Sequence, residues 1–210
     1  ALKEFKDKSG KFIYAYGLQG YTQGDYYLAS VADSIFANPE ASVDMPGLAS
    51  AIPYMKKLLD KVGVEMQVIR VGTFKSAVEP YILDSISPAN RLQTEHYLGS
   101  IWSVIRDSVA ASRDLAPARL DELVDSILVT RSAPELVELH LLDGLCFTKE
   151  FENKLKALTD VDEDDDLSLV TPGELAATVE KKDSGKHIAV LYAVGEIDDS
   201  DDDMNDDAIH

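Results

Sequence analysis

Short apolar runs alternate with helix-like patterns up to Lys75, and this alternation limits the chain to few architectures. The strand-like runs end at glycine, proline or asparagine, whereas the segments between them carry apolar residues three and four positions apart. Strands are expected at residues 12–16, 34–37, 42–45 and 64–71, with helices near residues 24–32 and 52–62. This alternation indicates an α/β fold rather than one with separate strand and helix regions.

Helices dominate after residue 87. Ser87 and Pro88 form a favourable helix start, with serine as the N-cap and proline at the first helical position. An apolar stripe toward Arg113 then predicts one helix of about 25 residues. Two shorter helices are expected, one near residues 117–128 and one that opens with the capping-box spacing of residues 132–135.

The net charge of −18 comes mostly from two acidic segments. Thirteen of the 38 acidic residues lie at residues 160–166 and 198–207, and without them 20 basic residues face 25 acidic ones. An acidic excess repels phosphate backbones, so no nucleic-acid partner is expected. Neither segment has the spaced ligands, central glycine and distal glutamate of a calcium loop, so we interpret them as solvated linker and tail.

Other common sites are excluded by residue type and spacing. The four histidines show no metal-ligand spacing, and no phosphate-cradling glycine loop occurs, so neither a metal nor a cofactor is expected. Neither a nucleophile-elbow serine nor a cysteine with a plausible histidine partner is apparent. The single cysteine, Cys146, rules out an internal disulfide and is expected to be buried. No apolar stretch approaches about 18 residues, so no membrane span is expected.

Lys75 is the candidate catalytic residue, because it lies between an apolar run and a helix-like start. Residues 64–71 are predicted to form a buried strand, which residues 72–73 then end. Apolar neighbours and a nearby helix N-terminus both disfavour the ammonium form of a lysine. A neutral lysine can act as a general base, whereas the alternative is a solvated surface lysine of ordinary pKa. The adjacent Ser76 is interpreted as a helix-start residue.

Two longer stretches carry a family resemblance. The first is YYLASVADSIFANP at residues 26–39, and the second is GTFKSAVEP at residues 72–80. With ELHLLDGL at residues 138–145 and the apolar run at residues 188–194, they resemble the signal peptide peptidase A family, also called the protease IV family. The resemblance covers roughly residues 10–197.

The resemblance implies a serine peptidase with a serine–lysine dyad, built from two tandem α/β halves of the crotonase-like or Clp-protease-like kind. Lys75 matches the general base within its motif, whereas the serine belongs to an Asn-Ser-Pro-Gly-Gly type of motif that does not occur in this chain. Burial is what such a base requires, since the pKa of a lysine must fall from about 10.4 to near 7.

An incomplete fold is therefore expected, and the chain is interpreted as a fragment of the first half. Residues 1–158 would be this lysine-bearing half, truncated at its start, and residues 159–185 an acidic linker. Residues 186–197 would hold the first strand of the second half, and residues 198–210 an acidic tail.

The leading hypothesis is a serine-type endopeptidase that degrades cleaved signal peptides, with this chain carrying the base but not the nucleophile. The resemblance implies apolar peptides and the missing second half as partners, a homo-oligomer, and an anchor outside this chain in the bacterial inner membrane, facing the periplasmic or extracytoplasmic side. The alternative is a non-catalytic crotonase-like assembly domain with a structural lysine. A crotonase-type acyl-CoA enzyme is disfavoured, because no oxyanion-forming glycine pair is apparent.

Overall fold

The computed structural model describes residues 1–178. The chain divides into two units, Ala1–Leu167 and Ser168–His210, and most of the second lies beyond the described part. The strand expected at residues 188–194 and the acidic tail at residues 198–210 fall outside the described residues.

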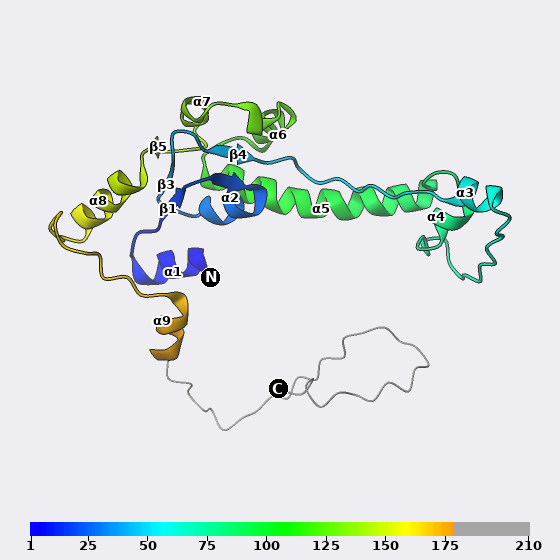
Figure 1. Cartoon of the computed structure of the whole chain (residues 1–210), viewed down its shortest axis with the longest axis horizontal. Coiled ribbons are helices and arrows are strands. Elements are labelled where there is room, and N and C mark those ends of the chain that lie inside the picture. The colour runs from blue at the N-terminus through cyan, green and yellow to red at the C-terminus, as the bar shows by residue number, and fades with distance from the viewer. Residues whose placement is uncertain (179–210) are drawn as a thin grey trace, which may run out of the picture. The chain divides into compact units, whose positions relative to one another are not determined.

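Parallel strands form two small sheets in the first unit (Figure 1). Strands β1 (Tyr14–Gly17), β3 (Ser34–Ala37) and β5 (Gly144–Leu145) form one sheet in the order β1-β3-β5, and β2 (Gly20–Thr22) pairs with β4 (Ser42–Asp44). A parallel pair needs a crossover connection, and helix α2 (Gln23–Ala29) lies in the connection between β1 and β3. The α/β class is confirmed, as are the strands near residues 12–16, 34–37 and 42–45, while β2 and β5 were not expected.

The core lies where these strands meet the later helices. Helices α6 (Pro117–Asp125) and α7 (Ala133–Glu138) and the 3₁₀ turn η1 (Leu128–Thr130) contribute buried leucines to it. Tyr26 is fully buried, and its hydroxyl donates a 2.6 Å hydrogen bond to the Leu141 carbonyl, which satisfies its polar end. The core also includes Ile35, Val43, Val109, Leu120, Leu128, Leu136 and Leu142.

Helix α5 (Pro88–Ser112) confirms the long helix predicted from its cap and stripe. It has 25 residues, so it extends about 37 Å at 1.5 Å per residue. The Ser87 hydroxyl accepts a 3.1 Å hydrogen bond from the Asn90 amide, as an N-cap should. Its buried residues are Asn90 in the first turn and Val109 and Ala110 near the end. The C-terminal half of α5, from Trp102 on, therefore packs in or against the core.

The predicted buried strand at residues 64–71 is wrong. These residues have no regular secondary structure and follow the short helix α3 (Lys56–Lys61), while α4 (Glu79–Ile82) comes after Lys75. Ile69 is 101% exposed and Val71 is 87% exposed. An apolar run becomes a strand only when another strand pairs with it, and no described residue pairs here.

Three further helices were not expected: α1 (Leu2–Ser9), α8 (Thr148–Leu158) and α9 (Pro172–Thr178). Helix α9 falls within the segment that we expected to be linker, and a capping box explains its start. The Glu174 amide donates to the Thr171 hydroxyl at 3.2 Å, and the Thr171 amide donates to the Glu174 carboxylate at 2.7 Å. Over residues 1–178, no helix combines the length and apolarity that crossing a membrane requires.

Candidate active site

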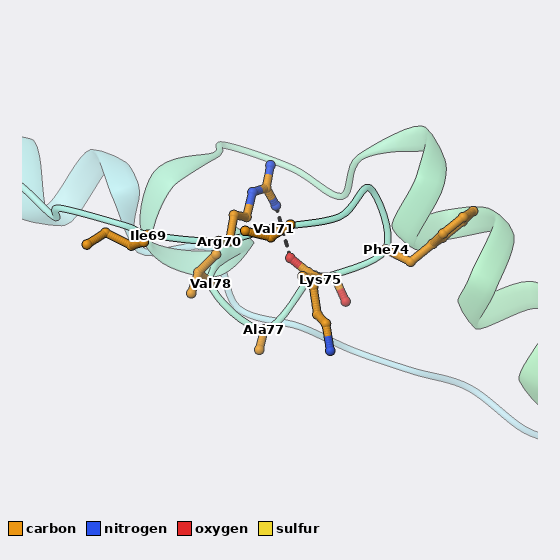
Figure 2. A pocket seen from close by; sticks show the side chains of 8 residues that line it. Ile69, Arg70, Val71, Phe74, Lys75, Ala77 and Val78 are labelled. Carbon is orange, nitrogen blue, oxygen red and sulfur yellow. Dashed lines mark hydrogen bonds between the residues drawn. The ribbon is translucent and has the colours of Figure 1, made fainter.

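Lys75 lies in an exposed loop between the apolar segment at residues 64–71 and helix α4. Lys75 lines an open pocket of about 520 Å³, and Figure 2 shows the side chains around that pocket. The residues that line the pocket are Ile69, Arg70, Val71, Phe74, Lys75, Ser76, Ala77 and Val78. Lys75 thus lines a pocket whose walls are mostly apolar.

The burial that we expected around Lys75 is not present. Lys75 itself is exposed, as are Phe74, at 54%, and Val71, at 87%. The cause is the missing strand pairing, since an unpaired apolar run leaves no wall against the lysine. Ser76 does not begin the helix, which starts at Glu79, and its carbonyl instead accepts a 2.9 Å hydrogen bond from the Glu79 amide.

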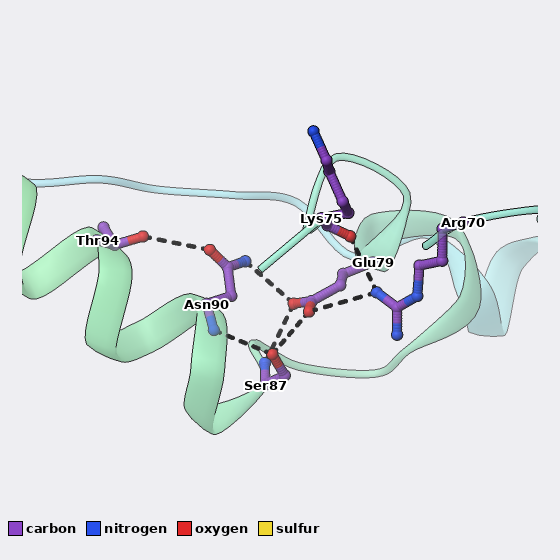
Figure 3. A network of polar contacts seen from close by, with 6 residues as sticks. All are labelled: Arg70, Lys75, Glu79, Ser87, Asn90 and Thr94. Carbon is purple, nitrogen blue, oxygen red and sulfur yellow. Dashed lines mark hydrogen bonds and ion pairs between the residues drawn. The ribbon is translucent and has the colours of Figure 1, made fainter. Parts of the chain in front are cut away.

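A tight backbone turn shapes the loop that carries Lys75. Gly72 has a φ of 104°, a conformation that residues with a Cβ rarely adopt. The Lys75 amide donates to the Gly72 carbonyl at 3.4 Å, and Arg70 Nη1 donates to the Lys75 carbonyl at 3.0 Å. The side chain of Lys75 points away from this contact (Figure 3).

Glu79 is the buried member of this region, with only 1% of its surface exposed. Its carboxylate accepts hydrogen bonds from the Ser87 hydroxyl at 2.6 Å, the Ser87 amide at 3.2 Å and Asn90 Nδ2 at 3.0 Å (Figure 3). Arg70 Nη1 lies 3.8 Å from Glu79 Oε1. These contacts, the Ser87 hydroxyl first among them, hold the pKa of Glu79 below its usual range.

Sequence reasoning singled out Lys75 but assigned no role to Arg70 or Glu79, although Glu79 lies in the motif at residues 72–80 and Arg70 lies just before it. No periodic pattern marks the glutamate as buried, since its partners Ser87 and Asn90 come from a different helix. The one available signal is its position directly before Pro80, at the start of α4. Within residues 1–178, no cluster of histidine, cysteine or carboxylate side chains could hold a metal ion.

Comparison with known proteins gives the same family as the motifs. The sequence pattern of peptidase family S49 matches residues 5–162. Protease 4 of Salmonella typhi is 37% identical over 95% of this chain and 33% of its own length. Protease 4 of Haemophilus influenzae is 41% identical over 57% of this chain and 19% of its own length.

A plant relative is also similar. The chloroplastic serine protease SPPA of Arabidopsis thaliana is 29% identical over 78% of this chain and 24% of its own length. The chain thus spans a third or less of the length of these relatives. Because the family pattern covers most of the sequence, the chain belongs to peptidase family S49.

Proposed function

We propose that Lys75 is the general base of a serine peptidase whose nucleophile is supplied by sequence outside these 210 residues. One observation carries the proposal: the lysine of the family motif lies in an open pocket with apolar walls. A lysine base must be shielded from water to become neutral, so another protein surface has to cover it. The exposed apolar walls of the pocket are the residues that such a surface would bury.

The chemistry requires one proton to move twice. A neutral Lys75 amine would take the proton of a serine hydroxyl as its oxygen attacks the scissile carbonyl, and would return that proton to the leaving amine. Lysine alone would then perform the proton transfers that histidine performs in a Ser-His-Asp triad. The rest of the protein would desolvate Lys75 by covering the apolar pocket walls.

We propose apolar peptides as the substrate class, and the apolar pocket walls support this choice. Ile69, Val71 and Phe74 line the pocket and favour apolar peptides over charged ones. Cleaved signal peptides are apolar and fit this preference. We further propose that the protein acts as a homo-oligomer on the extracytoplasmic face of a bacterial inner membrane, anchored by a segment outside this chain. The similarity to protease 4 supports the peptide cleavage that we propose.

The test is substitution of Lys75 in the full-length protein. Lys75→Ala should abolish cleavage of an apolar fluorogenic peptide, and so should Lys75→Arg, since arginine stays protonated. Lys57→Ala, at an exposed lysine of α3, is the matched control and should keep full activity. Turnover near the wild-type rate in either Lys75 variant would refute the proposed base.

An assembly domain without catalysis is the second candidate, and the exposed apolar segment at residues 64–74 favours it, because such surfaces bind other chains. The same cleavage assay, applied to the wild-type protein, separates the two functions. A non-catalytic domain predicts no peptide cleavage by the wild-type protein, while light scattering still detects an oligomer.

A further inference from the structure

The Glu79 carboxylate is a buried charge eight residues before the cap of α5, and it belongs to the same motif as Lys75. A carboxylate loses its hydration when it is buried, which is costly unless hydrogen-bond donors replace the water. Ser87 and Asn90 supply these donors from the first turn of α5, where the helix dipole also favours a negative charge. Glu79 is therefore a fixed negative charge at neutral pH.

Arg70 connects this charge to the backbone of Lys75. Its Nη1 atom lies 3.8 Å from Glu79 Oε1 and donates a 3.0 Å hydrogen bond to the Lys75 carbonyl (Figure 3). The Arg70 side chain is 37% exposed, so without the carboxylate its guanidinium could turn into solvent. The negative charge of Glu79 thus keeps Arg70 in position to hold Lys75.

Little else fixes the backbone of Lys75 within the described residues. Its amide makes a 3.4 Å hydrogen bond to the Gly72 carbonyl, which is longer than the usual 2.7–3.2 Å. The neighbouring side chains Phe74 and Val71 are exposed and contribute little packing. The contact from Arg70 is therefore the main restraint on the position of Lys75.

We propose that Glu79 is a positioning residue for Lys75 and acts through Arg70. The proposal rests on the proposed role of Lys75 as a base. A general base must lie within hydrogen-bond reach of the proton that it takes, and a displacement of about 1 Å can lower the rate about 100-fold. By fixing the Lys75 backbone, the pair would place the amine against the serine hydroxyl.

A purely structural role for Glu79 is the competing explanation, because its carboxylate also anchors the start of α5. Arg70 separates the two roles, since it makes no contact with Ser87 or Asn90 that the structure records. Loss of Arg70 should leave the α5 cap intact while releasing Lys75. Loss of Glu79 should affect both.

The experiment is a double-mutant cycle on peptide cleavage by the full-length protein, with Arg70→Ala, Glu79→Gln and the pair together. We expect each single variant to lower kcat about 10- to 100-fold with KM nearly unchanged. The double variant should be no slower than the slower single variant, because both changes break one connection. Arg70→Lys, which keeps the charge and a donor, should restore part of kcat.

Matched controls are Arg91→Ala, on the exposed face of α5, and Glu122→Gln, at an exposed glutamate of α6, both expected to keep wild-type rates. Wild-type kcat in Arg70→Ala, alongside an inactive Lys75→Ala, would overturn the positioning role and leave the proposed base intact. Additive losses in the double variant would also overturn it. Full activity in Lys75→Ala would instead refute the proposed function itself.

Discussion

Arg113 and Asp143 join the C-terminal end of α5 to the sheet through two hydrogen bonds, of 2.8 and 3.0 Å. The same carboxylate accepts a 2.7 Å hydrogen bond from the amide of Ile35 in the middle strand, β3. Partial burial of Asp143 opposes its ionisation, but the Arg113 guanidinium and the Ile35 amide prevail and hold its pKa below the usual range. One side chain therefore links helix and sheet.

Asp143→Asn should destabilise the chain, because an amide cannot accept both charge-assisted hydrogen bonds from Arg113. We expect the free energy of unfolding to fall by about 2 kcal/mol, measured by urea denaturation of the 210-residue chain. Asp107→Asn, at an exposed carboxylate that pairs with Arg106, is the control and should change it by less than about 0.5 kcal/mol. Equal effects of the two substitutions would contradict this role of Asp143.

Glu79 should make stability depend on pH. Its pKa in the folded chain lies below the value of about 4.3 that an unfolded glutamate has. Its ionised form therefore stabilises the fold above about pH 4, and this contribution disappears as the pH falls through the folded pKa. The difference in unfolding free energy between wild type and Glu79→Gln, measured in urea, should shrink between pH 7 and pH 3. A constant difference over this range would show that the charge contributes nothing.

Ile69→Asp should separate folding from activity. Ile69 is fully exposed, so the substitution should change the unfolding free energy of the 210-residue chain by less than about 0.5 kcal/mol. In the full-length protein the same aspartate would lie in the pocket walls that we propose to be covered, and peptide cleavage should be largely lost. Wild-type cleavage by this variant would argue against a covering surface. Leu158→Asp, at another exposed apolar residue, is the control for a general effect of the charge.

The 210-residue chain on its own should not cleave peptides, since the proposed serine nucleophile lies outside it. The measurement is turnover of an apolar fluorogenic peptide by the purified chain, with its Lys75→Ala variant as the background. Cleavage by the wild-type chain that exceeds this background would show that a nucleophile is present within it.

Local signals predicted those elements whose causes are local. The cap at Ser87 and Pro88 gave the start of α5, because capping depends on the neighbouring three residues. The run at residues 34–37 became β3 as expected, since its ends are marked by Asn38-Pro39 and its neighbours β1 and β5 are present. Prediction succeeded where the capping residues or pairing strands that stabilise an element are among the described residues.

The prediction of a strand at residues 64–71 was wrong because no pairing strand is present among the described residues. The composition of this run indicates a strand, but composition does not state whether a pairing partner exists. Lys75 could be singled out from its position in the motif, whereas the contact between Glu79 and Ser87 depends on how α4 meets α5. Tertiary contacts of this kind leave no periodic trace in the sequence.

Under the proposed function, the C-terminal end of α5 contributes to folding, while its N-terminal end contributes to both folding and catalysis through the contacts of Ser87 and Asn90 with Glu79. Substitutions near Val109 should mainly lower stability, whereas substitutions near Asn90 should lower both stability and peptide cleavage. A deep mutational scan for abundance and one for peptide cleavage should both show losses near Asn90, whereas only the cleavage scan should show them at the exposed Lys75. The motif around Lys75 could be rebuilt for other substrates while the core stays as it is.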